Sequence, residues 1–327
     1  MKKSPGEFQL IARLCADLPR GKRTRLGPGD DCAILAPARF AQLVTIDSMV
    51  EGVHFKLEWG SPQVIGARAL TVNLSDIAAM GGVPTACVVN LAVRPGLDMA
   101  FFDKLYAGLR EMAVATGVDI VGGNITRASQ LAITVTLLGD GRDGILRRDT
   151  AHPGDAVYVT GTLGDAALGW RILDGKIRAR GGVRKYLTDR FLKPTARLAA
   201  GRALARMRPA PAAIDISDGL WQDLGHILER SCAGAEIDAD AIPLSTLYRA
   251  LMGDDLELAL GGGDDYELLF CTPPRLSDAA LSRRLGVPVH RIGSIVAGSA
   301  AVLRRGEAAQ NLKVPRLKGW DQLRTPD

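Results

Sequence analysis

Aspartates and glycines occur together at the ends of apolar runs in several parts of this chain of 327 residues. The stretches are GPGDDCAIL (27–35), VTIDSMVEGVHF (44–55), NLSDIAAMGG (73–82), IVGGNITR (120–127), AIDISDGLWQDLGH (213–226) and GGGDDYELLF (261–270). Five of the six bring aspartates, and the fourth brings Asn124. Because the ends of strands and helices are where sites are commonly built, these side chains are candidates for one shared cleft.

Carboxylate oxygens are the ligands that Mg²⁺ prefers, together with phosphate oxygens and water. Glycines let the backbone approach a phosphate closely. The combination therefore predicts a magnesium–nucleotide site. The sequences G-x-x-x-x-G-K-[ST] and G-x-G-x-x-G-x-V are both absent, and lysines lie far from the glycine-rich turns. Positive charge at the phosphates must then come from metal ions and arginine.

Each stretch also has a purely structural explanation. Pairs of Asp and Gly are common in turns, and Asp215 and Asp218 could cap a helix that begins near Leu220. Asp76 could be solvated, and His54 could be an ordinary packed or surface imidazole. The prediction of a site therefore depends on the number of such stretches taken together.

Composition limits the class of protein. Hydrophobic residues make up 47% of the chain and charged residues 24%, which is typical of a globular core. The net charge of +5 comes from scattered arginines, so we expect no nucleic-acid partner, and the balance suits phosphorylated anions. The five cysteines form no C-x-x-C pair, which indicates reduced thiols in the cytoplasm. No stretch approaches the ~18 apolar residues of a membrane helix.

Alternating elements must position these residues in the first half of the chain. Residues 33–49 and 85–93 are predicted to form buried strands, and 62–81 and 98–116 to form helices. Two further strands are predicted over 118–124 and 131–140. This pattern predicts an α+β or mixed α/β domain.

A stretch rich in Gly, Asp and Arg, residues 139–155, indicates the domain junction. We therefore expect an N-terminal domain over 1–140 and a C-terminal α/β domain over 141–327. The second half is predicted to contain strands at 156–161 and 212–217. Its predicted helices cover 164–175, 185–193, 195–207 and 219–231.

In this order, GDDCAIL, DSMVEGVHF, NLSDIAAMGG, GGNITR, YVTGTLGDAALG, DISDGL and GGGDDYELLF resemble the thiamine-monophosphate kinase family. This family belongs to a superfamily with aminoimidazole-ribonucleotide synthetase. The resemblance implies a two-domain α/β fold whose N-terminal mixed sheet forms a barrel across a homodimer. It also implies that ATP phosphorylates thiamine phosphate to thiamine diphosphate. Because the acceptor is already anionic, it needs no general base, and we expect direct in-line transfer assisted by several Mg²⁺ ions.

The resemblance also implies a role for each site residue. Mg²⁺ would be held by Asp31, Asp47, Asp76, Asp215 and Asp218, with help from Thr45, the backbone near Ile46 and Asn124; the catalytic residues among them would be Asp31, Asp47, Asp76 and Asp218. ATP would contact Gly123, Asn124, Arg148 and Ser217. Thiamine phosphate would contact His54, Asp264 and Trp320.

The chain departs from the family pattern at two positions. Asn124 stands where the family usually has Asp, and Ile46 stands where a hydroxyl residue is common. We therefore expect an active kinase with a raised Mg²⁺ requirement. The alternatives are another ATP-dependent enzyme of the superfamily, such as an aminoimidazole-ribonucleotide synthetase, or a nucleotide-binding paralogue with reduced catalysis.

Overall fold

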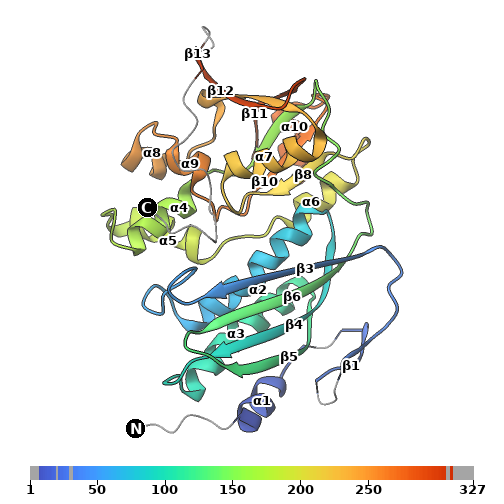
Figure 1. Cartoon of the computed structure of the whole chain (residues 1–327), viewed down its shortest axis with the longest axis vertical. Coiled ribbons are helices and arrows are strands. Elements are labelled where there is room, and N and C mark those ends of the chain that lie inside the picture. Colours follow the sequence, from blue (N-terminus) through green and yellow to red (C-terminus); the bar gives the residue numbers. More distant parts are fainter. Residues whose placement is uncertain (1–6, 20, 29–31, 307–309, 312–327) are drawn as a thin grey trace. The chain divides into compact units, whose positions relative to one another are not determined.

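The computed structural model describes residues 7–19, 21–28, 32–306 and 310–311. The chain divides into two compact units (Figure 1). Unit 1 comprises Met1–Ile77 and Gly82–Arg142, and unit 2 comprises Ala78–Gly81 and Asp143–Asp327. Among the helices of the described residues, none is both long enough and apolar enough to cross a membrane.

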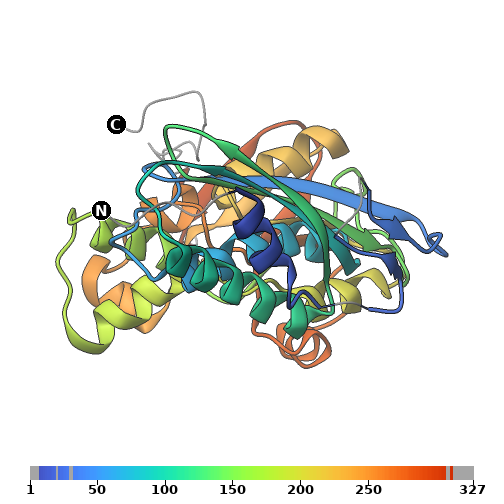
Figure 2. The ribbon, with the colours of Figure 1, turned by 90° about the horizontal axis from the view of Figure 1, so that it is seen from below.

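Unit 1 is built on a four-stranded mixed sheet. Its elements are α1 (Glu7–Cys15), β1 (Thr24–Leu26), β2 (Ile34–Leu35), β3 (Gln42–Val50), α2 (Pro62–Ala79), β4 (Val83–Val93), α3 (Met99–Thr116), β5 (Asp119–Arg127) and β6 (Ala132–Asp140). The strand order is β3-β6-β4-β5, in which only β4 and β5 run parallel. Helices α2 and α3 lie on one side of the sheet (Figure 2).

Glycines allow α2 and α3 to pack closely on each other. A Cβ atom at Gly66 would lie 1.9 Å from the carbonyl oxygen of Leu105, and one at Gly108 would lie 1.8 Å from that of Gln63. No side chain fits at such distances, so the helix contact requires glycine on both helices. Helix α3 then ends at Gly117, whose φ of 72° is the left-handed conformation that glycine adopts most readily.

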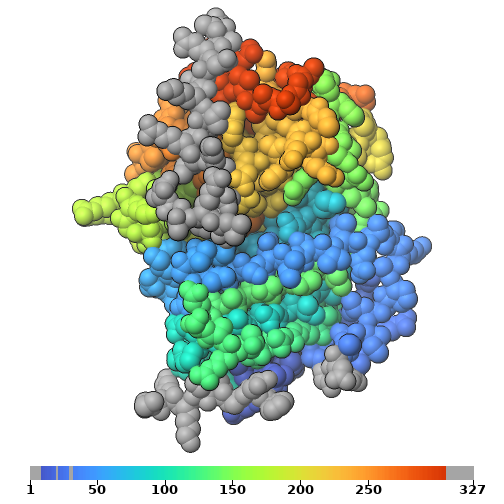
Figure 3. All heavy atoms as spheres, viewed as in Figure 1, coloured from blue at the N-terminus to red at the C-terminus, as the bar shows by residue number. Residues whose placement is uncertain are grey.

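The opposite face of this sheet exposes apolar side chains. Val44 and Ile46 on β3 are 64% and 62% exposed, and Val88 on β4 is 40% exposed. Figure 3 shows β3 and β6 at the molecular surface. The prediction of a buried strand over 33–49 is therefore wrong for β3, because only alternate residues of the strand face the helices.

Unit 2 is built on a seven-stranded sheet with the order β13-β12-β9-β11-β7-β10-β8, in which only β12 and β9 run parallel. Its elements are β7 (Ala156–Thr160), α4 (Asp165–Leu173), α5 (Gly181–Leu192), α6 (Leu198–Ala205), β8 (Ala212–Asp215), α7 (Leu220–Ser231), β9 (Gly234–Asp238), η1 (Ala239–Ala241), α8 (Thr246–Met252), α9 (Glu257–Gly261), β10 (Leu268–Thr272), α10 (Asp278–Leu285), β11 (Val289–Val296), β12 (Ala301–Arg305) and β13 (Gln310–Asn311).

The central strands β7 and β10 are buried at every residue. Val157 and Val159 belong to one apolar cluster, whereas Tyr158 and Phe270 belong to another on the opposite face. The rings of Tyr158 and Phe270 stack with their centroids 5.2 Å apart. A strand buried on both faces has a nearly continuous apolar sequence, which is why the strand over 156–161 could be predicted. The predicted helices over 98–116 and 219–231 and the α/β character of both units are confirmed.

Candidate active site

In unit 1, Thr45 on β3 and Asp76 on α2 lie in contact, since the Thr45 hydroxyl donates a hydrogen bond to the Asp76 carboxylate. Asp47 lies two residues farther along β3 and so points to the same side of the sheet as Thr45. The Ile46 side chain points to the opposite side, where it is 62% exposed. Only the backbone of Ile46 can therefore share a site with Asp76.

His54 follows β3 and is fixed at two points. The Val50 amide donates to His54 Nδ1 over 3.0 Å, and Arg68 Nη1 donates to the His54 carbonyl oxygen over 2.8 Å. Because Nδ1 accepts a hydrogen bond, the neutral ring carries its proton on Nε2. Glu51 in the same segment pairs with Arg94 over 2.8 Å, and this pairing lowers the Glu51 pKa.

Asn124 lies on the open face of the unit 1 sheet. In the strand register, Asn124 on β5 lies opposite Asn90 on β4, Asn90 lies opposite Thr134 on β6, and Thr134 lies opposite Ser48 on β3. These four residues therefore share one face of the sheet. Asn124 Nδ2 donates to Asn90 Oδ1 over 2.9 Å. Thr45 and Asp47 point to the other face, so unit 1 by itself does not bring the Asn124 side chain to Asp76.

Gly123 precedes Asn124 on β5 and needs to be glycine. A Cβ atom at this position would lie 2.1 Å from the Val89 carbonyl oxygen. The close approach of β4 to the middle of β5 therefore requires glycine here.

In unit 2, the loop between β8 and α7 is organised by Asp223. One carboxylate oxygen of Asp223 accepts hydrogen bonds from the backbone N–H groups of Ser217, Asp218 and Gly219, each over 3.1 Å. Asp223 is only 2% exposed. The residue that precedes α7 is Gly219, and no side chain caps the helix. The explanation of Asp215 and Asp218 as helix caps is therefore wrong.

Asp218 lies among charged and polar groups from several elements. Gln222 Nε2 donates to its carboxylate over 3.0 Å. Burial raises the Asp218 pKa, and the charge of Asp264 adds to this effect, while Gln222, His226 and Arg148 oppose it. Arg148 and Asp264 thus lie close enough to Asp218 to act on its charge, although the sequence separates the three widely.

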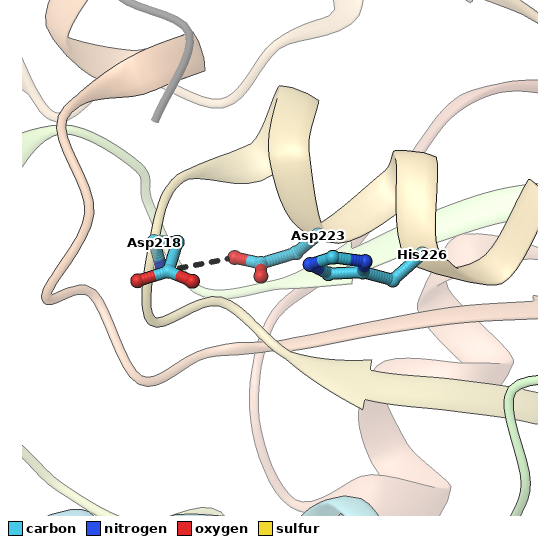
Figure 4. A group of neighbouring side chains, drawn as sticks. All are labelled: Asp218, Asp223 and His226. Carbon is cyan, nitrogen blue, oxygen red and sulfur yellow. Dashed lines mark hydrogen bonds between the residues drawn. The ribbon is translucent and has the colours of Figure 1, made fainter. Parts of the chain in front are cut away.

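Asp218, Asp223 and His226 point toward one another (Figure 4). Their candidate ligand atoms lie within 4.8 Å of one another. Burial, together with the charges of Asp215 and Asp218, raises the Asp223 pKa to about 8. Carboxylates crowded in this way repel one another, and a divalent cation would relieve the repulsion. The two carboxylates suit Mg²⁺, which prefers oxygen ligands, whereas the His226 nitrogen is a donor that Mg²⁺ does not favour.

The loop that carries Asp264 packs against the loop that carries Asp218. The Asp264 amide donates to the Ser217 carbonyl oxygen over 2.8 Å, and the Tyr266 amide donates to that of Ile216 over 2.8 Å. Gly263 has a φ of 73°, and a Cβ atom there would lie 2.6 Å from the Ser217 carbonyl oxygen. The glycines of GGGDDYELLF thus allow two backbones to come together.

Within each unit, the structure brings some of the predicted site residues together. In unit 1 these are Thr45 and Asp76, with Asp47 on the same side of the sheet, and in unit 2 they are Arg148, Asp215, Ser217, Asp218 and Asp264. Asp31 and Trp320 lie outside the described residues. Asp223 was not among the predicted residues, although an aspartate in the first turn of a helix was a usable signal.

Two protein-family models match the chain, one for each domain. The AIR synthase related protein N-terminal domain matches residues 29–140, and the corresponding C-terminal domain matches residues 152–305. The two-domain fold predicted from the sequence is thereby confirmed.

Proteins of known name resemble the chain along nearly its whole length. The thiamine-monophosphate kinase of Escherichia coli K12 is 39% identical over 98% of this chain and 99% of its own, and that of Bacillus subtilis is 36% identical over 80% and 82%. The crystal structure of thiamine-monophosphate kinase from Stenotrophomonas maltophilia has a TM-score of 0.81 and 38% identity, covering 92% of this chain and 97% of its own.

AaThiL complexed with AMPPCP and TMP has a TM-score of 0.76 and 30% identity, and the match covers 97% of both chains. Hydrogenase maturation protein HypE in complex with ATP, at 20% identity and a TM-score of 0.75, shares the fold. The chain therefore belongs to the thiamine-monophosphate kinase family of AIR synthase-related proteins and is a kinase.

Proposed function

We propose that the chain transfers the γ-phosphoryl group of ATP directly to thiamine phosphate and forms thiamine diphosphate and ADP. The observation that carries this proposal is the packing of the Ser217–Asp218 loop against the Asp264 loop, with Arg148 beside them. The solved structure of AaThiL, whose sequence is 30% identical to this chain, is a complex with TMP and with AMPPCP, an ATP analogue.

The proposed reaction needs charge neutralisation more than it needs a base. An oxygen of thiamine phosphate attacks the γ-phosphorus, the bond from that phosphorus to the bridging oxygen breaks, and ADP leaves. The divalent cations, when bound, neutralise the two phosphate groups and align them. The residues that would hold Mg²⁺ are Asp31, Asp47, Asp76, Asp215 and Asp218, with Thr45 and the Ile46 backbone. Asn124, on the opposite face of the sheet, would join such a site only through the second copy of the proposed dimer.

The remaining residues bind and orient the substrates. Arg148 and the backbone at Gly123 and Ser217 would contact ATP. His54 would donate from Nε2 to the acceptor, because its Nδ1 is already occupied by the Val50 amide. Asp264 would accept from the cationic thiamine portion, and Trp320 would stack on a thiamine ring.

The assay for this function measures ADP and thiamine diphosphate in the same reaction. We expect equal amounts of the two products, and no ADP above background when thiamine phosphate is omitted. ADP formed only with a different acceptor would favour another activity of the superfamily, and no ADP with any acceptor would favour a nucleotide-binding paralogue. Direct transfer predicts inversion at a chiral γ-phosphate, whereas retention would contradict it.

The enzyme is proposed to act as a cytoplasmic homodimer. Val44, Ile46 and Val88 expose an apolar face of the unit 1 sheet, which a second copy would cover to form a barrel. All five cysteines are free, as expected for a reducing compartment. Sedimentation of the purified chain tests the dimer, and a monomer at all concentrations would contradict it.

A further inference from the structure

A buried ionic cluster lies beneath the Asp264 loop in unit 2. Glu267, the last residue before β10, has no exposed surface. Its carboxylate accepts from Arg197 Nε over 2.7 Å, from Arg190 Nη2 over 3.2 Å and from the Thr160 hydroxyl over 2.6 Å. A second hydrogen bond from Arg197 Nη2 makes that pair bidentate. A buried carboxylate that lost one of these cations would be strongly destabilised.

The same loop has a second anchor at Asp265. This carboxylate is 3% exposed and accepts from the Gly164 amide over 2.8 Å and from the Ala166 amide over 3.4 Å. Asp265 thus connects the loop to the start of α4. Glu267 connects it to Arg190 on α5 and to Arg197, which precedes α6. Gly161 makes room for the Glu267 anchor, since a Cβ atom there would lie 2.2 Å from a Glu267 carboxylate oxygen.

These anchors hold a backbone conformation that is unfavourable by itself. Asp264 and Tyr266 have φ values of 61° and 51°, although neither is glycine. The left-handed conformation costs non-glycine residues roughly 1–2 kcal/mol each. The loop keeps it only where surrounding contacts enforce it. Relaxation would break the hydrogen bonds of Asp264 to Ser217 and of Tyr266 to Ile216.

We infer that Arg190 and Arg197 are positioning residues that act through Glu267 to hold Asp264 where it binds the thiamine portion of the acceptor. The inference rests on the proposed function for the identity of that ligand. Neither arginine contacts the acceptor in this account. Their side chains are only 18% and 17% exposed, and both point to the buried carboxylate.

Arg197→Lys is the sharpest test, because lysine keeps the charge but cannot form the bidentate pair. Thr160→Val removes the hydrogen bond to Glu267 and the one that the hydroxyl accepts from the Leu268 amide, with little change in shape and no loss of an arginine. The matched control is Arg202→Met, which removes a surface arginine paired with Asp143 over 2.9 Å in the same unit.

We expect Arg197→Lys to raise KM for thiamine phosphate about tenfold while KM for ATP changes less than about twofold. Thr160→Val should show a smaller change in the same direction, and Arg202→Met should show none. Unchanged constants in folded Arg197→Lys and Thr160→Val would overturn the inference. So would an equal rise of both KM values, which a general structural role would produce.

Amide hydrogen exchange provides a readout that does not depend on activity. In the wild type, the amides of Asp264 and Tyr266 should be protected, and Arg197→Lys or Thr160→Val should lose this protection while Arg202→Met keeps it. If the wild type has no thiamine-phosphate kinase activity but this pattern appears, the proposed function fails and the loop anchoring stands. Retained protection in both variants would overturn the anchoring itself.

Discussion

Replacing Asp265 with Asn should change how the stability of unit 2 depends on pH. Three buried carboxylates, those of Asp165, Asp265 and Glu267, lie near the guanidinium groups of Arg190 and Arg197. Burial, assisted by repulsion from Asp165 and Glu267, raises the pKa of Asp265 to about 8 against the opposing effects of the Gly164 amide and Arg190. Asp265 is therefore expected to hold a proton in the native state near neutral pH.

The size of the change in stability follows from the difference between the pKa of Asp265 in the native protein and in the unfolded chain. An unfolded aspartate has a pKa of about 3.9, so between about pH 4 and pH 8 the native protein binds a proton that the unfolded chain does not. The free energy of unfolding then falls as pH rises, by about 1.4 kcal/mol per pH unit from this group. Asn cannot titrate. The stability of the wild type relative to Asp265→Asn should therefore decrease by roughly 2–3 kcal/mol from about pH 5.5 to pH 7.5.

Urea unfolding at these two pH values, followed by the fluorescence of Trp170 and Trp221 in unit 2, measures this difference. The control is Asp254→Asn, at a carboxylate that is 75% exposed and pairs with Arg249 at the surface. Because surface pairs contribute only about 0–1 kcal/mol, its difference from the wild type should change by much less. If the difference for Asp265→Asn stays constant within about 0.5 kcal/mol, Asp265 is ionised in the native protein and the reasoning is refuted.

Three further substitutions test other parts of the account. Gly263→Ala should lower the free energy of unfolding by about 2 kcal/mol or more, because φ is 73° and the new Cβ would meet the Ser217 carbonyl; urea unfolding equal to wild type would contradict this. Asn124→Asp should lower the Mg²⁺ concentration that gives the half-maximal rate, and coincident Mg²⁺ titrations would show that Asn124 is not a ligand. Ile46→Lys, at an exposed apolar position, should shift sedimentation from dimer to monomer, and an unchanged dimer would exclude this face as the interface.

The elements of the fold could be predicted where burial makes the sequence periodic. Helix α3 begins after the capping residue Asp98 and ends at Gly117, and both signals are local. Strands β7 and β10 are apolar except for a final threonine, because both of their faces are covered. The exposed face of β3 could not be recognised, because nothing within the strand shows which side the helices cover.

The sequence could predict which residue types form the candidate site, but it could predict only in part the directions in which their side chains point. Asn124 was expected beside the aspartates, yet it points to the open face of the sheet. A register irregularity between Cys87 and Val88 changes how β4 aligns with β5, and a bulge of this kind depends on neighbouring strands. Glu267 was not predicted at all, since a glutamate after a glycine-rich loop is expected at the surface.

Cation binding by the aspartates is the central claim, and it can be measured without turnover. Mn²⁺, whose free form is counted by paramagnetic resonance, can replace Mg²⁺ in the presence of a non-hydrolysable ATP analogue. The account predicts that Asp47→Asn in unit 1 and Asp215→Asn in unit 2 each bind less Mn²⁺ than the wild type, while Asp254→Asn binds the same amount. Equal binding in all four proteins would contradict it.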